Sequence, residues 1–275
     1  MQKYWILSFL LVSNLLMAQE TIKIKPGQVI KLSLAKGESF APQTAFCGKD
    51  ELFFEKTTEK TFFFFATSYF SNPGVKINCG FRDQAKLEKN IAQLEIIDGA
   101  FPEEKLSVDP SKVHFSKKAL KQIAHDRIIL NKLYNHPHGS ALFTEPFLPP
   151  MDSVLTSDYG GRRLFNGHKA SQHLGVDFRA VVGSPVKSAN SGKVVLSEYL
   201  FFTGKTIIID HGLGIFSMYG HLSKLHVHKG NMVDRGAVIA SSGATGRVSG
   251  PHLHWGIKIN HNWVHPISLV EASAP

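Results

Sequence analysis

Cysteine is scarce in this chain, whose 275 residues include only Cys47 and Cys79. The sequence after Cys79 therefore offers no thiolate as a metal ligand. Long apolar runs are also missing beyond the first 18 residues, and no collagen-like or coiled-coil repeat is present. A composition of 43% hydrophobic and 19% charged residues excludes a disordered chain. The sequence thus predicts a folded protein, long enough for about two domains.

The apolar run at the N-terminus has the layout of a cleavable secretory signal. A single cation, Lys3, precedes an apolar stretch from Tyr4 to Met17, and the small residue Ala18 follows. The stretch is shorter than the ~20 residues of a spanning helix, and no cysteine marks a lipid anchor. We therefore predict a signal at residues 1–18 and a periplasmic or otherwise exported protein without stable membrane insertion. An uncleaved N-terminal anchor is the alternative.

Charge and cysteine usage fit an exported protein. Thirty-one Lys and Arg against 22 Asp and Glu give a formal net charge of +9, which suits anionic surfaces such as the cell wall; a generally basic proteome would give the same balance. We find no basic helix or aromatic RNA-binding motif and expect no nucleic-acid partner. In an oxidising compartment Cys47 and Cys79 are expected to form a disulfide, with two buried free thiols as the alternative.

The first half of the chain predicts a small domain followed by a linker. Residues 19–100 contain alternating strand patterns and four consecutive Phe within Thr61 to Phe65, expected to form a strand buried on both faces. We predict a β-rich accessory domain for wall contact or for control of access to a site. Residues 101–148 predict a helix that is N-capped by Ser116 and ends at Tyr134, and then a Pro-rich linker. The residues expected on the inward face of that helix are Leu120, Ile123, Ile128 and Leu130.

Residues 149–271 predict a second domain made of strands. Short β-branched runs alternate with glycines at regular spacing, and no helical pattern separates them. This arrangement favours an antiparallel sheet and makes the chain mainly β.

Four histidines and one aspartate of this second domain suggest a metal site. His252 and His254 are two apart and would share one face of a strand, and His173 precedes Asp177 by four residues. His221 follows another predicted strand. Three protein ligands drawn from His and Asp, with a fourth position open, are typical of catalytic zinc. Imidazole nitrogens with one carboxylate also suit zinc better than calcium or magnesium. The other histidines are expected to be structural or solvated.

Several motifs around these residues together resemble the lysostaphin/LytM-type zinc peptidases of the bacterial cell wall, including Gram-negative periplasmic members that control cell shape. The motifs are SDYGGRR at 157–163, RLFNG at 163–167, HLGVD at 173–177, GSPV at 183–186, YGHL at 219–222 and GATGRVSGPHLH at 243–254. The resemblance covers about residues 149–269. It implies one Zn²⁺ per chain held by His173, Asp177 and His254, with His221 and His252 as the catalytic pair.

The resemblance also implies peptidoglycan as the substrate. The expected reaction is D,D-endopeptidase cleavage of peptide cross-links in wall remodelling or cell-shape control, with a D,D-carboxypeptidase side activity on the same bond type. Arg163 and Asn166 are candidates for reading a peptide carboxylate, and Tyr219 for donating to the substrate; a loop-bracing arginine and a core tyrosine are the alternatives. Other functional hypotheses are a catalytically silent wall-binding scaffold or amidase activator, and a histidine-rich zinc buffer.

Overall fold

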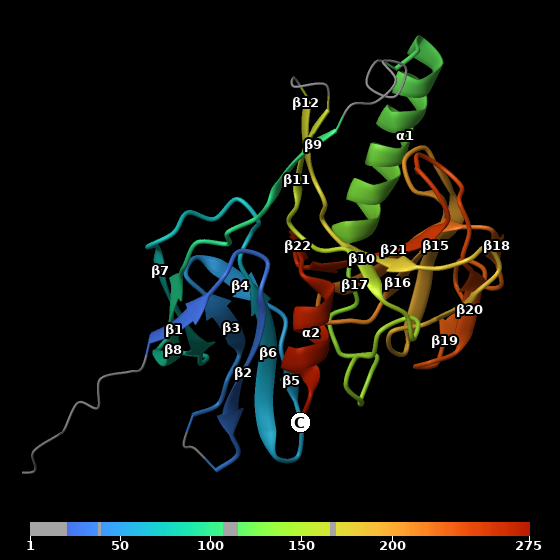
Figure 1. Cartoon of the computed structure of the whole chain (residues 1–275). Coiled ribbons are helices and arrows are strands. Elements are labelled where there is room, and N and C mark those ends of the chain that lie inside the picture. The colour runs from blue at the N-terminus through green and yellow to red at the C-terminus, as the bar shows by residue number, and fades with distance from the viewer. Residues whose placement is uncertain (1–20, 38–39, 107–114, 166–168) are drawn as a thin grey trace, which may run out of the picture.

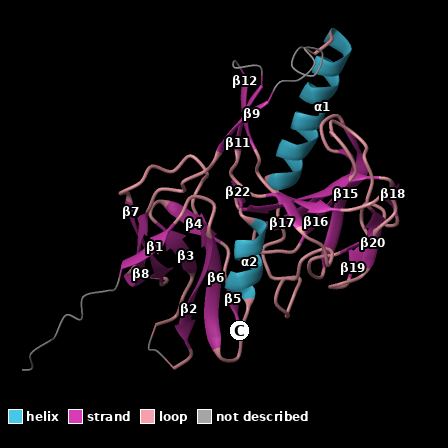
Figure 2. Cartoon of the chain, in the orientation of Figure 1, coloured by secondary structure: helices cyan, strands magenta, loops and turns pink. Residues whose placement is uncertain are grey.

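The structure, a computed structural model, describes residues 21–37, 40–106, 115–165 and 169–275. Strands make up most of it, and the N-terminal strands lie beside those of the C-terminal half (Figures 1 and 2). The sheets of the C-terminal half pair mainly antiparallel, so the predicted mainly β class is confirmed. Within the described ranges, no helix has the length and apolar content needed to cross a membrane. The predicted signal lies outside these ranges.

Two small sheets form the N-terminal half. One has five strands in the order β1-β8-β7-β3-β4, and the other has three in the order β2-β6-β5. Their bounds are β1 (Thr21–Ile24), β2 (Val29–Ala35), β3 (Thr44–Cys47), β4 (Asp50–Leu52), β5 (Glu55–Lys56), β6 (Lys60–Ala66), β7 (Lys76–Arg82) and β8 (Glu88–Ile96). Cys47 and Cys79 lie opposite each other on β3 and β7 and are joined by a disulfide.

The run of four phenylalanines in β6 is buried on both faces, as predicted. Successive side chains of a strand point to opposite faces. Phe63 and Phe65 pack into the core of the N-terminal half, whereas Phe62 and Phe64 pack into a core that extends through the C-terminal half. The Phe run therefore joins the two halves.

Hydrogen bonds reinforce this shared core. The Val29 amide donates to the buried Ser268 hydroxyl at 2.8 Å, and the His265 amide donates to the Gly27 carbonyl at 2.8 Å. Ser268 lies in α2 (Pro266–Ser273), a helix that the sequence analysis did not predict. Figure 1 shows α2 between the two halves. The N-terminal half is thus fixed against the C-terminal half by apolar burial and by hydrogen bonds.

An eight-stranded sheet forms the centre of the C-terminal half, with β10-β13-β21-β17-β16-β15-β19 as its main order and β22 paired to β21. The bounds of its strands are β10 (Leu155–Ser157), β13 (Val176–Arg179), β15 (Gly192–Leu200), β16 (Gly204–Asp210), β17 (Ile215–Leu222), β19 (Met232–Val233), β21 (His252–Ile259) and β22 (Asn262–Val264). Four of them, β15, β16, β17 and β21, were expected from the β-branched runs and are confirmed.

Two three-stranded sheets flank the central one. The first contains β14 (Pro185–Lys187), β20 (Val238–Ser241) and β18 (Lys224–Leu225). The second contains β12 (Lys169–Gln172), β11 (Arg162–Phe165) and β9 (Glu103–Leu106). Strand β9 belongs to the segment predicted as a linker, and it pairs in parallel with β11, which precedes the first histidine of the site.

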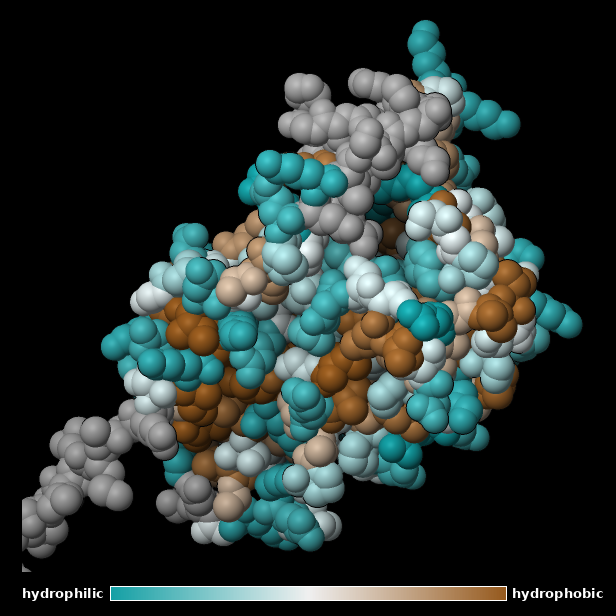
Figure 3. Space-filling view, viewed as in Figure 1, coloured by the Kyte–Doolittle hydropathy of each residue, from teal (hydrophilic) through white to brown (hydrophobic). Residues whose placement is uncertain are grey.

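The predicted helix is present as α1 (Lys117–Tyr134), and the Ser116 hydroxyl accepts the Ala119 amide as an N-cap. Its expected inward face is wrong at Leu120 and Ile128, which are 52% and 68% exposed, and confirmed at Leu130. The helix packs through Leu130, Tyr134 and the neighbouring Ile129 and Leu133. Apolar residues occur on nearly all sides of α1, so periodicity alone does not select the packed face. Its protruding end is hydrophilic in Figure 3.

Candidate metal centre

Two adjacent strands carry most of the site. In the antiparallel pair β13 and β21, Asp177 lies directly opposite His254. Residues that face each other across a ladder point to the same side of the sheet, and so do residues two apart on one strand. Asp177, His254 and His252 therefore share one face, while Trp255 and Val176 point to the core on the other face.

Glycines make room for these side chains. Gly220 of β17 lies opposite His254 on its other side, where it adds no side chain. Gly175, two residues before Asp177, lies so close to the His254 ring that a Cβ there would come within 2.6 Å of Cε1. Since real Cβ contacts are never this short, glycine is required at this position for the observed ring placement.

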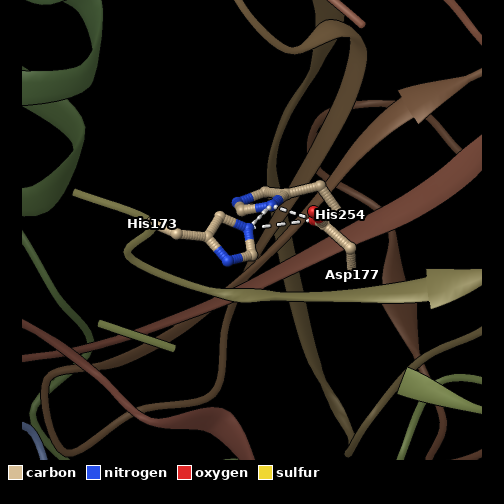
Figure 4. Close-up of side chains that lie close together, drawn as sticks. All are labelled: His173, Asp177 and His254. Carbon is tan, nitrogen blue, oxygen red and sulfur yellow. Dashed lines mark hydrogen bonds and ion pairs between the residues drawn. The ribbon is translucent and has the colours of Figure 1, made fainter. Parts of the chain in front are cut away.

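His173, Asp177 and His254 converge on one point, as Figure 4 shows. The Nε2 atom of His173 lies 3.0 Å from Asp177 Oδ1 and 3.2 Å from His254 Nδ1, and His254 Nδ1 lies 2.9 Å from the same carboxylate oxygen. All three ligand atoms fall within 4.8 Å of one another. His173 is 6% and Asp177 7% exposed, so the cluster is largely withdrawn from water.

The loop residue His173 is oriented by backbone groups outside the strands. Its Nδ1 lies 2.7 Å from the Asp158 carbonyl, which can only accept, so Nδ1 carries the hydrogen and Nε2 faces the cluster. The Gly160 amide donates to the His173 carbonyl at 2.7 Å. Tyr69, from the N-terminal half, in turn donates its hydroxyl to the Gly160 carbonyl at 3.1 Å.

The donor chemistry of the cluster fits a divalent metal ion. With Nδ1 of His173 committed to a carbonyl, a neutral ring directs its Nε2 lone pair at a carboxylate oxygen and at a second imidazole nitrogen. Such electron-pair donors repel one another at about 3 Å unless a cation or proton lies between them. Two imidazoles and one carboxylate are also ligands that zinc prefers. A metal-bound histidine commonly donates its other ring N–H to a carbonyl, as His173 Nδ1 does here.

The protonation states agree with a ligand role. Burial alone would raise the pKa of Asp177, but the adjacent His173 and His254 rings outweigh burial and hold that pKa well below its usual range. Burial lowers the pKa of His254, more than the Asp177 carboxylate raises it. Asp177 is therefore ionised and His254 neutral at neutral pH, the forms that bind metal.

His221 reaches the same face through a β-bulge. Tyr219 pairs with Ile207 and Leu222 with Lys205, so two residues of β17 lie opposite one residue of β16. His221 has a φ of 62°, a left-handed conformation that costs a non-glycine residue about 1–3 kcal/mol. Simple alternation would have put His221 on the core side with Tyr219. The bulge instead brings its ring centroid to 4.7 Å from that of His252.

His221 and His252 form a pair beside the ligands with similar orientation. The Nδ1 atom of His221 donates to the Thr245 carbonyl at 2.9 Å, and that of His252 donates to the Gly250 carbonyl at 2.8 Å. Each ring is therefore left with Nε2 for other partners, and His252 Nε2 lies 3.8 Å from Asp177 Oδ1. Burial lowers the pKa of His221 to about 4, although its bond to Thr245 opposes this.

The structure brings together the five predicted metal and catalytic residues, and of the three predicted substrate contacts it describes the side chain of Tyr219 alone. Tyr219 is 0% exposed, and its hydroxyl accepts the Ala189 amide at 2.8 Å, which matches the alternative of a core tyrosine. Asn166 lies outside the described residues. Arg163 is in β11, and its side chain is outside the description.

Sequence reasoning missed the residues that orient the histidines. Asp158, Thr203 and Thr245 act through backbone carbonyls: Asp158 and Thr245 accept from histidine rings, and Thr203 accepts the His221 amide at 2.6 Å. Every residue has a carbonyl, so the side chains carry no signal for this role. Asp158 falls within the SDYGGRR motif, but nothing in the motif shows that its main chain is used.

Comparison with known proteins agrees with this geometry. Residues 171–266 match peptidase family M23. The peptidoglycan DD-endopeptidase ShyA of Vibrio cholerae is 37% identical over 129 residues, 46% of this chain and 29% of that protein. The DD-carboxypeptidase/endopeptidase Mpg of Neisseria meningitidis serogroup B is 35% identical over 121 residues, 44% of this chain and 28% of that protein.

One solved structure is similar over nearly the whole chain. A Pseudomonas aeruginosa protein assigned to peptidase M23 superposes with a TM-score of 0.67 at 27% identity, covering 90% of this chain and 95% of that one. The likeness therefore includes the N-terminal half, whereas the matches to ShyA and Mpg span less than a third of those proteins. The chain contains a peptidase family M23 domain homologous to those of ShyA and Mpg.

Proposed function

We propose that this protein is a zinc-dependent endopeptidase that cleaves peptide cross-links of peptidoglycan. The observation that carries the proposal is the convergence of His173, Asp177 and His254 within 4.8 Å, with the His221 and His252 pair beside them. A ligand cluster of three leaves a position open for water and substrate, as in catalytic rather than structural zinc sites. The proposal includes one Zn²⁺ per chain.

In this proposal the residues of the chain divide the work. His173, Asp177 and His254 hold the zinc ion, which when bound supplies Lewis acidity toward water and the scissile carbonyl. His221 and His252 present their Nε2 atoms beside the ligands, where they can take up the proton of the attacking water and return one to the leaving amine. General acid–base catalysis of this kind contributes roughly 10²–10⁴-fold. Burial of the cluster strengthens its electrostatic interactions.

The substrate class is drawn from the relatives. ShyA is named a peptidoglycan DD-endopeptidase, and Mpg a DD-carboxypeptidase/endopeptidase. We extend to this chain the D,D bond of the cross-link, with a D,D-carboxypeptidase side activity, and a place in wall remodelling or cell-shape control. Export through the signal predicted at residues 1–18 and a periplasmic location are part of the same proposal, because peptidoglycan lies outside the cytoplasm.

Digestion of purified, cross-linked peptidoglycan tests the proposal. Residues 19–275 would be incubated with it, with and without a chelator, and the products identified by mass. Conversion of cross-linked dimers to monomers that stops with chelator and returns with zinc is expected. Bound zinc without any products would contradict the endopeptidase function and favour the silent scaffold, for which the His221→Ala variant would behave like the wild type in wall binding.

A further inference from the structure

Helix α1 lies on the same face of the central sheet as the metal centre. Phe216 and Met218 alternate along β17 with Gly220, which lies opposite His254, so all three positions share that face. Phe216 and Met218 pack with Tyr134 of the helix. The helix is therefore a neighbour of the site on this face, although it lies outside the segment that matches the peptidase family.

One buried carboxylate connects α1 to the body of the protein. Asp126 and Tyr134 are the two buried residues of the helix, and Asp126 is 7% exposed. Its Oδ1 accepts from Gln122 Nε2 and its Oδ2 from the Phe201 amide, both at 2.7 Å. Burying a carboxylate is costly unless hydrogen bonds compensate. The bond to Phe201 is the one that leaves the helix.

Phe201 begins the turn between β15 and β16, and each residue of this turn holds a different element. The Phe202 carbonyl accepts the Arg247 amide at 2.9 Å, and the Thr203 carbonyl accepts the His221 amide at 2.6 Å. Phe115, next to the N-cap of α1, packs edge-on against Phe201 and Phe202, with centroids 5.6 and 5.8 Å away. The helix thus contacts the turn by a charged hydrogen bond and by aromatic packing.

We propose that Asp126 is a positioning residue for His221. The left-handed backbone of His221 is unfavourable by itself and needs contacts that hold it, and the Thr203 carbonyl is one of them. Asp126 fixes the turn that presents this carbonyl. The inference rests on the proposed function, because it assigns His221 to proton transfer, but its structural part does not depend on the substrate.

The test compares three variants on a soluble cross-linked muropeptide dimer. Asp126→Ala should lower kcat about tenfold with KM little changed, since a 1 Å misplacement of a catalytic group costs roughly 10²-fold and the loss of this indirect support should displace His221 by less than that. Zinc content should stay at the wild-type value. Asp126→Asn keeps an oxygen that can accept the Phe201 amide, and should restore most of the kcat. Leu133→Ala, which weakens helix packing elsewhere, should lower Tm without a comparable loss of kcat.

Hydrogen–deuterium exchange gives a readout that needs no activity. In Asp126→Ala the amide of His221, measured in peptides that cover residues 219–223, should exchange faster than in the wild type and in Leu133→Ala. Equal exchange, or a kcat in Asp126→Asn as low as in Asp126→Ala, would overturn the positioning role. A wild-type protein without peptidase activity would instead overturn the proposed function, and exchange alone would then decide the role of Asp126.

Discussion

The three proposed metal ligands are held in two different ways. Asp177 and His254 lie opposite each other on β13 and β21, inside the central sheet, and their positions follow from strand pairing. His173 lies in the loop before β13, and its supports are the Asp158 carbonyl, the Gly160 amide and, one step further, the Tyr69 hydroxyl. The first arrangement is local to two strands, whereas the second depends on residues up to about a hundred positions away.

The segment that matches peptidase family M23 therefore does not contain all the residues that orient the side chains of its site. Residues 171–266 include the three proposed ligands and the two proposed catalytic histidines. They exclude Tyr69, Asp158 and Gly160, and they exclude the α1 carboxylate that holds the turn near His221. The N-terminal half and helix α1 therefore contribute hydrogen bonds that orient residues around the site, in addition to any role in wall contact or access.

Alanine substitutions in β21 should have the largest effects, because this strand carries both a proposed metal ligand, His254, and a proposed proton carrier, His252. His254→Ala should lose zinc, whereas His252→Ala should keep it and lower kcat by roughly 10²–10⁴-fold, the usual contribution of a general acid or base. Zinc would be measured by metal analysis and turnover on the muropeptide dimer. Zinc lost from His252→Ala but retained in His254→Ala would reverse the two assignments.

Acid should lower the stability of the central sheet, which carries Asp177 and His254, through His211. This residue directly follows β16. It is 0% exposed, its Nδ1 donates to the Ser191 carbonyl, and its Nε2 lies 2.7 Å from the Ser217 hydroxyl. Burial lowers the pKa of His211 to about 4. The unfolded chain binds a proton near pH 6.5 and the folded protein only near 4, so the stability from this residue is present above pH 6.5 and decreases as the pH falls toward 4.

At about 1.4 kcal/mol per pKa unit, the lost stability is roughly 3 kcal/mol. Denaturant unfolding at pH 7 and pH 4.5 measures it, with His211→Gln as the reference. The neighbouring Asp210, whose pKa burial raises, is present in both proteins, so its contribution cancels. Equal losses of stability in the two proteins would show that His211 is not the source.

The strand-held part of the site is also the part that sequence could predict. Alternation along β21 puts His252 and His254 on one face, and the β-branched runs identify the strands that carry them. His221 could not be placed in this way, because its orientation comes from a bulge that depends on how β16 pairs with β17. The packed face of α1 was likewise unpredictable, since it is chosen by contacts with a sheet formed about 70 residues later.

Gly175 lies between the loop-held ligand His173 and the strand-held ligand Asp177. Gly175→Ala would put a Cβ 2.6 Å from His254 Cε1 and 2.7 Å from the Trp255 carbonyl, so the ring must move. Displacing a ligand by a neighbouring residue lowers metal affinity by about 10–100-fold. Zinc competition with a chelator measures this. Gly161→Ala, whose Cβ meets nothing within 4 Å, is the matched control and should bind zinc like the wild type.

Tyr69→Phe tests the most distant support of the loop-held ligand His173. The variant keeps the ring that stacks on Phe101 at 4.7 Å and removes only the hydroxyl that donates to the Gly160 carbonyl. A hydrogen bond of this kind contributes about 1 kcal/mol, which corresponds to roughly fivefold in zinc affinity if all of it reaches His173. The exposed Tyr199, changed to Phe, controls for loss of a hydroxyl. Equal affinity in both variants would show that the N-terminal half packs beside the ligand loop without supporting it.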